Sequence, residues 1–419
     1  MIFLFLRDLE TCYKQSLEDI TEVCRSWRIA ALTNRRLWSR ILIYLQEYDY
    51  PLDYELCKRR LHRYLERSVA APLSIEITLN TDFWPPHHNE SMARIQSLIA
   101  CISQELSRWA SLSIDFEGGL HQFPFGSRED DLIKPLESLL RSPMPALRRL
   151  SLCGVRGSLE GCFPHVPSLN AFETKDCCTT NLDIPWSSLF SFRFSSNHFS
   201  SDSRHLLSLP ECDRLKDLYI EGTELDTYKL GITFNCTLPN VVSFHLDSLP
   251  SREPVNICLA NFRLPSLQNL TLVVPNAFWD RREDSYVPPY MTRAEMTMSE
   301  HIVGFAGTCK HLTLLWSETV PYHQWTDVSA RYVTSRSVVI FDMFNGMPDL
   351  EELHLCDKIS EVFLAVIKEE ETLVPKLSRV FILDARGGKV PLQLEGIARR
   401  WQTDENRETH EVPSRYELC

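Results

Sequence analysis

The sequence predicts an α/β fold in which a small all-helical head precedes an irregular solenoid of parallel strands, with helices and loops outside the strands. A short phrase of alternating apolar residues recurs along most of the chain, apolar stripes at helical spacing lie between some of its copies, and two tryptophans mark a helical segment near the N-terminus. With 419 residues, the chain exceeds the usual length of one compact domain, and an array of repeats accommodates that length.

The head begins with a segment that carries an apolar stripe. Ile20, Val23, Cys24, Trp27 and Ala31 recur mainly at intervals of three and four residues, which places them on one face of a helix. Aromatic side chains at this spacing usually belong to a core. We therefore expect Trp27, and the tryptophan at position 38 behind it, to be buried in a small helical unit.

The same segment has a distinctive wording. Valine, cysteine and a basic residue follow one another, and a tryptophan stands two residues after the basic one. A second basic residue comes directly after that tryptophan, and a leucine-tryptophan pair begins ten residues after it. This set resembles the second half of the F-box of fungal F-box proteins. The residues that carry the resemblance are Val23, Cys24, Arg25, Trp27, Arg28, Leu37 and Trp38.

The resemblance implies a domain order and a role. Residues 66–68 and 71–75 are similar to the family's junction between a helix and the first repeat strand, while the leucine-proline start of the box would lie ahead of Met1. The expected parts are an F-box-like helical module at 1–50, shortened at its front, a linking helix at 51–70, a repeat domain at 71–405 and a polar tail at 406–419. In that family the box binds the Skp-type adaptor of a cullin ubiquitin ligase complex, and the repeats hold a protein substrate.

The body contains a repeated phrase of one apolar residue, two variable residues, a second apolar residue, one variable residue and a third apolar residue. Four consecutive copies, at Leu189, Leu215, Val241 and Leu267, begin 26 residues apart. A period in the twenties is typical of leucine-rich repeats. Clear copies begin at Leu147, Leu215, Leu267 and Leu350, and weaker ones at Trp109, Leu169, Leu189, Val241, Leu312 and Leu377.

Each copy predicts a short strand whose second and third apolar residues point into a shared core. Helical stripes at 92–106, 132–140 and 359–367 are expected on the convex side, and the copies between about 152 and 267 are expected to cross back through loops. Regular leucine-rich repeats place asparagine or cysteine three residues after the third apolar residue. Val155, Pro275 and Lys358 stand there instead. The backbone polar groups of these turns must therefore form their hydrogen bonds with other partners.

The variable strand positions are the candidate substrate surface, because a curved sheet face is the usual recognition surface of a solenoid. Strand alternation predicts Tyr219 and His245 exposed, between core residues. The alternative is a solvated sheet face without a partner. The candidate substrate residues are Arg193, Tyr219, His245, Thr271, His354 and Phe381. A second candidate surface is an aromatic insertion at 278–290, with Trp316, Tyr322 and Trp325, although it could instead cap its own repeats.

Composition excludes several classes of partner and compartment. The formal net charge of -12 argues against a nucleic-acid surface, which needs clustered Lys and Arg. The 14 cysteines form no Cys-x-x-Cys pair, and several lie in apolar runs, where a thiol packs as a small hydrophobe. No apolar run is long enough to span a membrane. We expect reduced cysteines and an intracellular protein, cytoplasmic or nuclear.

No arrangement of residues predicts an enzyme, a metal site or a cofactor. Residues 386–389 lack the first glycine and the Ser or Thr of a phosphate-binding loop, and His87 with His88 has no further ligand at metal spacing. Two functions remain open. One is substrate recognition for a cullin ubiquitin ligase, and the alternative is a leucine-rich-repeat scaffold whose shortened F-box no longer binds the adaptor.

Overall fold

The computed structural model describes residues 24–45, 51–80, 88–117, 136–180, 182–196, 208–222, 236–248, 262–274, 307–316, 344, 346–356, 374–383 and 389–392. The chain divides into two compact units, 1–234 and 235–419. Each unit contains parallel strands that follow the sequence repeat, and each is considered by itself.

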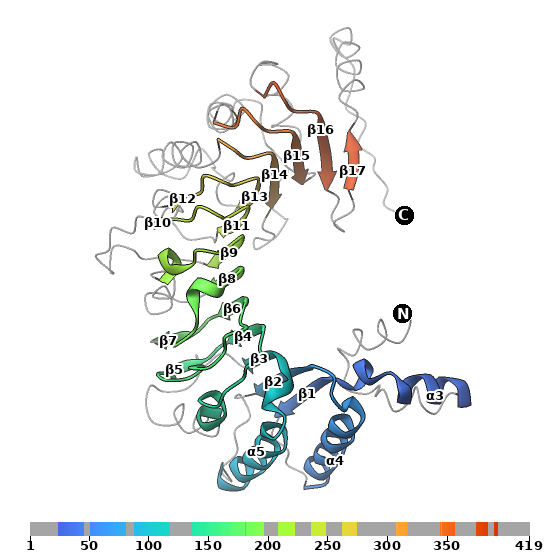
Figure 1. Cartoon of the computed structure of the whole chain (residues 1–419). Coiled ribbons are helices and arrows are strands. Elements are labelled where there is room, and N and C mark those ends of the chain that lie inside the picture. The colour runs from blue at the N-terminus through green and yellow to red at the C-terminus, as the bar shows by residue number, and fades with distance from the viewer. Residues whose placement is uncertain are drawn as a thin grey trace, which may run out of the picture. The chain divides into compact units, whose positions relative to one another are not determined.

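The first unit is organised around strands that pair in parallel with the next strand of the same sheet (Figure 1). They are β1 (Arg40–Leu45), β2 (Leu73–Asn80), β3 (Trp109–Glu117), β4 (Arg149–Cys153), β6 (Ala171–Lys175), β8 (Ser191–Ser196) and β9 (Asp217–Gly222). Neighbouring strands of the sheet follow one another in chain order. Each crossover therefore carries the chain back to begin a new strand beside the previous one and parallel to it. This is the connectivity of a solenoid.

The second unit repeats the arrangement. Its parallel strands are β11 (Ser243–Ser248), β13 (Asn269–Val274), β14 (His311–Trp316), β15 (Glu352–Cys356) and β16 (Arg379–Leu383). A further strand, β17 (Lys389–Leu392), runs antiparallel to β16 and was not predicted. Pro391 lies opposite Phe381 in this outermost strand, where a residue without an N–H group is tolerated.

The core confirms the predicted α/β solenoid of leucine-rich-repeat type. In the first unit the strand register aligns Leu150, Phe172, Phe192 and Leu218 side by side, and all are buried. The residues that begin the copies, such as Leu147 and those at 169, 189 and 215, are fully buried as well. In the second unit the corresponding core row is Phe244, Leu270, Leu312, Leu353 and Val380.

Among the described residues, the longer helices lie in the N-terminal part of the first unit. They are α3 (Arg25–Thr33), the 3₁₀ turn η1 (Arg35–Trp38), α4 (Pro51–Ser68), α5 (His88–Ser103) and the 3₁₀ turn η2 (Leu106–Arg108). α4 contacts η1, β1 and α5. α5 covers most of the predicted 92–106 stripe, with Ile99 and Ile102 buried, and residues 136–140 are helical with Leu136, Leu139 and Leu140 buried. The third stripe, 359–367, lies outside the described residues.

The prediction of an all-helical head at 1–50 was wrong at its C-terminal end. Residues 40–45 form β1, which pairs in parallel with β2 and places Ile41 beside Ile75 and Ile43 beside Ile77. The physical reason is strand alternation, because Ile41 and Ile43 are both buried in the sheet core while Leu42 between them is exposed. Trp38 stands three residues before Ile41, as the first apolar residue of a repeat does. The described sheet therefore begins 31 residues before position 71.

The described parts of the middle crossovers contain loops, as predicted, and also short strand pairs and 3₁₀ turns. β5 (Arg156–Ser158) pairs with β7 (Cys178–Thr180) in the first unit, which also has the 3₁₀ turn η4 (Trp186–Ser188). β10 (Cys236–Thr237) pairs with β12 (Phe262–Arg263) in the second unit. At one turn, Cys177 occupies the position at which regular leucine-rich repeats carry asparagine or cysteine. Its thiol donates to the carbonyl oxygens of Leu152 and Lys175, each at 3.1 Å.

The copy that we began at Leu312 was misplaced by three residues. Cys309 is fully buried at the first apolar place, and Leu312 and Leu314 are the second and third. Its thiol contacts the carbonyl oxygens of Gln268 at 3.6 Å and His311 at 3.4 Å. A cysteine packs in place of leucine here, and burial raises the pKa of its thiol to about 12.

Candidate recognition surfaces

In each unit, the predicted substrate residues lie on the face of the sheet opposite the core row. This face is called the outer face. In the first unit, register places Glu173 beside Arg193 and Arg193 beside Tyr219. The Arg193 guanidinium lies 4.0 Å from the centre of the Tyr219 ring, and its Nε is 3.4 Å from Glu173 Oε1. The Tyr219 hydroxyl donates to Glu221 Oε2 at 3.1 Å, and Arg193 Nη2 is 3.7 Å from the same oxygen.

This first-unit cluster of Glu173, Arg193, Tyr219 and Glu221 corrects one expectation. Tyr219 is half-buried instead of exposed, because the arginine of the neighbouring strand covers its ring. Arg193 remains exposed. Its ion pairs are therefore solvated, and such pairs contribute only about 0–1 kcal/mol each. A binding partner could replace them at little cost.

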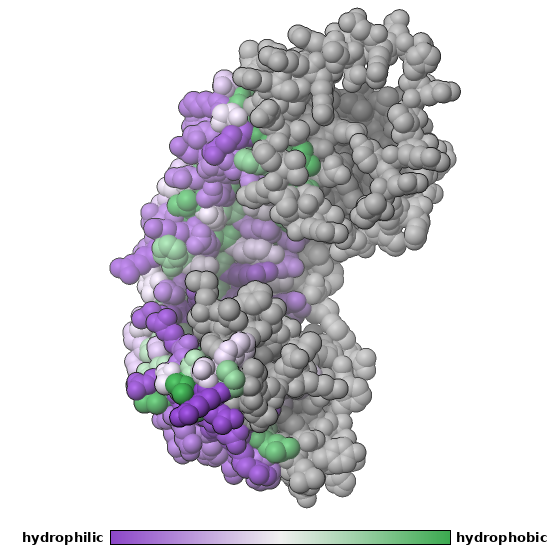
Figure 2. All heavy atoms as spheres, turned by 90° about the vertical axis from the view of Figure 1, so that its right-hand side faces the viewer, coloured by the Kyte–Doolittle hydropathy of each residue, from purple (hydrophilic) through white to green (hydrophobic). Residues whose placement is uncertain are grey.

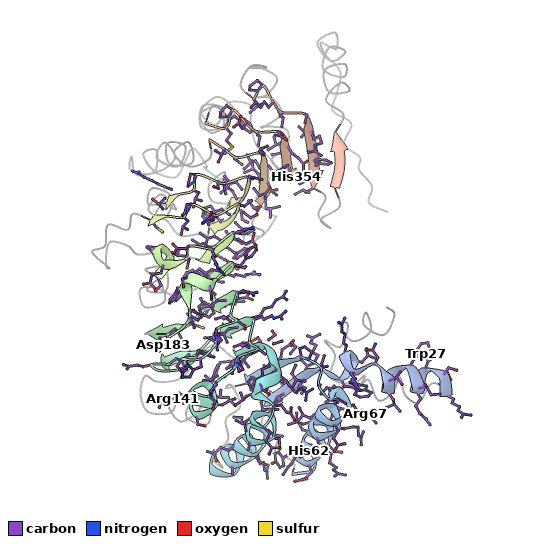
Figure 3. The ribbon with its side chains drawn as sticks, viewed as in Figure 1. Trp27, His62, Arg67, Arg141, Asp183 and His354 are labelled. Atoms are coloured by element: carbon purple, nitrogen blue, oxygen red, sulfur yellow. The ribbon has the colours of Figure 1, made fainter. Side chains whose placement is uncertain are left out.

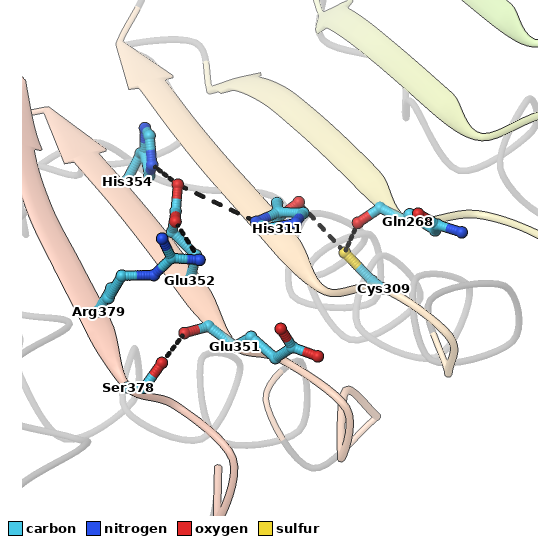
Figure 4. A network of polar contacts seen from close by, with 8 residues as sticks. All are labelled: Gln268, Cys309, His311, Glu351, Glu352, His354, Ser378 and Arg379. Atoms are coloured by element: carbon cyan, nitrogen blue, oxygen red, sulfur yellow. Dashed lines mark hydrogen bonds and ion pairs between the residues drawn. The ribbon is translucent and has the colours of Figure 1, made fainter.

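The second unit carries a more enclosed cluster of His311, Glu352, His354 and Arg379 (Figure 4). Glu352 Oε1 is 2.5 Å from His354 Nε2 and 4.0 Å from His311 Nδ1, while Glu352 Oε2 is 2.9 Å from Arg379 Nη2. The Glu352 side chain is only 15% exposed and that of Arg379 is 56% exposed. The Glu352 carboxylate thus lies at the centre of the cluster, and the Arg379 side chain remains largely exposed to solvent.

Electrostatics at this second-unit cluster favour the charged carboxylate. Burial by itself would raise the pKa of Glu352, but the hydrogen bond from His354 and the charge of Arg379 outweigh it, with smaller contributions from the charges of His354 and His311. The pKa of Glu352 is therefore lowered from its ordinary value. The fold therefore holds a half-buried carboxylate among basic side chains and favours its ionised form.

The remaining predicted substrate residues differ in exposure. His354 is buried, and its ring lies 4.8 Å from that of Phe381, measured between centroids. His245 and Thr271 are register neighbours and both half-buried, so His245 is not exposed as expected. The structure brings Arg193 to Tyr219 in the first unit and His354 to Phe381 in the second.

Glu352 and Arg379 stand at variable strand positions of the predicted face, but three other members of these clusters were missed in the sequence. Glu173 stands four residues after Leu169, as Arg193 does after Leu189, so aligning the copies position by position would have found it. His311 was missed because that copy was begun at Leu312. Glu221 lies one strand position beyond the predicted row and gives no sequence signal of its own.

The predicted adaptor-binding residues divide into an exposed and a buried group. Trp27, Ile29 and Leu32 on α3 are 37%, 55% and 41% exposed, and Trp27 projects from α3 (Figure 3). Cys24 caps α3, with its sulfur 3.5 Å from the Trp27 amide nitrogen. Two basic residues in the first part of this helix, Arg25 and Arg28, are exposed as well. Val23 lies outside the described residues.

The expected burial of Trp27 was wrong. α3 ends at Thr33, where the Asn34 amide donates to Ala30 O, and only the last turn of the helix reaches the tryptophan at position 38. Ala31 is accordingly the buried residue of α3. The first turn, with Trp27, presents its side chains to solvent.

Leu37 and Trp38 are fully buried. The Trp38 indole Nε1 donates to Ala31 O at 2.8 Å, its ring meets Tyr64 of α4 edge-on at 5.2 Å, and the Arg67 guanidinium lies 4.2 Å from its centre. These contacts join η1 to α4 at the start of the sheet. Trp38 therefore acts as core, as predicted.

The surface of the described residues is otherwise mostly hydrophilic on the side shown in Figure 2, with scattered apolar side chains. No group of three or more His, Cys, Asp or Glu among the described residues is placed to hold a metal ion. None of the helices in the described ranges is long and apolar enough to cross a membrane. The aromatic insertion at 278–290, Tyr322, Trp325 and His87 lie outside the described residues.

The solved structures that are similar to this chain include two at 12% sequence identity. One is the leucine-rich repeat-containing protein LegL7 from Legionella pneumophila, with 84% of this chain and 92% of that chain covered and a TM-score of 0.36. The other is a protein from Bacteroides fragilis, with 84% of this chain and 79% of that chain covered and a TM-score of 0.30. No family model and no curated protein sequence matches the chain. The repeat assignment depends on the strand order and register of the chain itself.

Proposed function

We propose that this protein is a substrate-recognition subunit of a cullin ubiquitin ligase complex, in which α3 docks a Skp-type adaptor and the outer faces of the repeats hold a protein substrate. The proposal is carried by α3, which leaves Ile29 and Leu32 exposed on one side of the helix and Trp27 exposed on another side. It lies within the segment that resembles the F-box.

The α3 surface has the composition of a protein contact. Tryptophan and arginine carry a large share of binding energy at interfaces, and α3 exposes Trp27 with Arg25 and Arg28 beside it. An amphipathic helix commonly binds by laying its apolar residues into a groove of its partner. Ile29 and Leu32 stand three residues apart on this helix and supply such anchors.

The outer faces suit the second role. Glu173, Arg193 and Tyr219 are held on neighbouring strands, so they present a fixed pattern of charge and ring surface. In this proposal the chain has no catalytic residue, cofactor or metal, and it accelerates ubiquitin transfer by holding the substrate near the transferring enzyme.

The test is co-purification of the full chain with a Skp-type adaptor and cullin, followed by chemical crosslinking and mass spectrometry of the captured proteins. The proposal expects adaptor and cullin in stoichiometric amount, crosslinks from the adaptor to the α3 region, and crosslinks from a substrate to the repeats. Absence of the adaptor from the purified complex would refute the ligase role.

A scaffold that does not bind the adaptor is the second candidate, and one observation favours it. Leu37 and Trp38 belong to the resemblance but are fully buried against the start of the sheet, so they can be explained by folding alone. In that case the same purification yields a stable protein partner crosslinked to the repeats, without adaptor or cullin.

A further inference from the structure

A cysteine and a histidine meet on the surface of the first unit, at the contact between α4 and α5. Cys101 Sγ, near the C-terminal end of α5, is 3.7 Å from His62 Nε2 on α4. His62 is exposed and Cys101 is partly exposed, and Figure 3 places His62 on α4. A thiol within reach of a neutral imidazole nitrogen can transfer its proton to that nitrogen, and the thiolate is the nucleophilic form.

Charged side chains of both signs lie along the helix contact that holds this pair. Lys58 and His62 stand one helical turn apart on α4, and Arg94 precedes Cys101 by two turns on α5. Lys58 Nζ and Arg94 Cζ each lie 5.9 Å from the centre of the Tyr54 ring, which shows that both cations gather along the same helix contact. Carboxylates are near as well, at Glu55 and at Glu66 one turn beyond His62. Lys58 and Arg94 lie on the same helix contact as the pair and would attract an anionic reagent to it.

Three other thiols of the described residues are held in their protonated form. Burial raises the pKa of Cys236 to about 11 and that of Cys309 to about 12. Cys153 is partly exposed like Cys101, but burial and its hydrogen bond with Asp115 raise its pKa strongly. These cysteines provide internal references of low reactivity.

We propose that Cys101 is a modification site that exchanges with anionic low-molecular-weight disulfides, with His62 as its base. The Cys101 thiol gives its proton to His62 Nε2, and Sγ attacks one sulfur of the disulfide. The S–S bond breaks, a mixed disulfide forms on Cys101, and the released thiolate takes the proton from His62. Cys101 is oxidised, and half of the disulfide is reduced to a thiol.

The test exposes the full chain to glutathione disulfide at neutral pH and follows each cysteine by peptide mass spectrometry. Cys101 should form the mixed disulfide at least about tenfold faster than Cys153, and His62→Gln should remove most of that difference, because a positioned base and the thiolate it generates control the rate. The glutamine keeps a similar size and polarity but cannot accept the proton. The control His165→Gln changes an exposed histidine elsewhere in the first unit and should leave the rate unchanged.

Two results would overturn the proposal. One is a Cys101 rate equal to that of Cys153 in the unmodified protein. The other is an unchanged Cys101 rate in His62→Gln. If His62→Gln lowers the melting temperature, His62→Asn provides a second uncharged variant without a base, and the proposal requires it to be slow as well.

Discussion

At the residue scale, the two tryptophans near the start of the chain differ in role although they share one sequence pattern. Trp38 is fully buried between η1 and α4, while Trp27 is 37% exposed on α3. The difference follows from where α3 ends, because only its last turn reaches the core. One tryptophan therefore belongs to the core, and the other keeps part of its ring at the surface.

This difference predicts unequal effects on stability. Trp38→Ala should lower the free energy of unfolding by about 3–5 kcal/mol, as is typical for removing a buried aromatic side chain. Trp27→Ala should lower it by less than about 1 kcal/mol, because exposed positions contribute little. Denaturant unfolding of both variants measures this. Similar losses in the two variants would mean that Trp27 is part of the core.

Glu352 predicts a specific dependence of stability on pH. The fold lowers its pKa, so its ionised form contributes stability that is present above the ordinary glutamate pKa of about 4.3 and is lost as pH falls through the lowered folded value. Glu352→Gln should therefore weaken the fall in stability at acid pH. Denaturant unfolding between neutral and acid pH measures the effect.

The matched control is Glu351→Gln, one residue earlier, where the carboxylate forms an exposed pair with Lys310 at 3.2 Å. Exposed pairs contribute little, so this variant should retain the acid dependence of the unmodified protein. If the two variants have identical pH profiles, the enclosed cluster around Glu352 does not stabilise the fold.

At the element scale, the strands could be predicted because alternation of apolar residues determines which face enters the core. Phe172, Phe192 and Leu218 followed from that pattern. The boundaries of the sheet could not be predicted in the same way. β1 was hidden within a segment that resembles a helical module, and β17 depends on an antiparallel pairing that repeats do not encode. The copy containing His311 was misplaced because Cys309 fills the place of a leucine.

The candidate surfaces were predictable only in outline. Alternation identified the outer-face positions, but it did not predict that Arg193 would cover Tyr219 or that His354 would be buried beside Phe381. Those outcomes depend on side chains of neighbouring strands about 20 or more residues away in sequence. Sequence periodicity gives the face of a strand and not the packing between strands.

Strand register at β9 gives a direct prediction. Leu218 is 2% exposed, so Leu218→Ala should lower the free energy of unfolding by about 2–5 kcal/mol through cavity formation. Tyr219→Ala removes the half-buried ring beneath Arg193 and should cost about 1 kcal/mol or less, since the contacts it loses are solvated. Thermal or denaturant unfolding distinguishes them, and equal losses would show that the register is wrong.

At the scale of the whole molecule, the proposed role separates binding from stability. α3 holds exposed side chains and the outer face of the first unit exposes Arg193, whereas the core rows consist of buried apolar side chains. Variants that abolish binding without unfolding should therefore exist. Variants of this kind would distinguish a recognition protein from a chain whose surface has no partner.

The substrate surface predicts such a variant. Arg193→Ala removes an exposed guanidinium whose two ion pairs are solvated, so the melting temperature should change little. Capture of the substrate found by crosslinking should fall at least about tenfold if Arg193 is an anchor, since interface arginines often contribute 2 kcal/mol or more. Quantitative pull-down provides the measurement, and unchanged capture would place the substrate elsewhere on the chain.

The most direct test of the central claim is titration calorimetry of the purified full chain with a Skp-type adaptor. The account predicts binding at micromolar concentration or tighter, and a loss of at least about tenfold in the double variant Ile29→Ala and Leu32→Ala, because both side chains are exposed anchors of α3. Leu56→Ala on α4, which removes a 57% exposed leucine, is the matched control and should bind as the unmodified chain does. Absence of binding by the unmodified chain, or equal affinity of the double variant and the control, would contradict the proposed function.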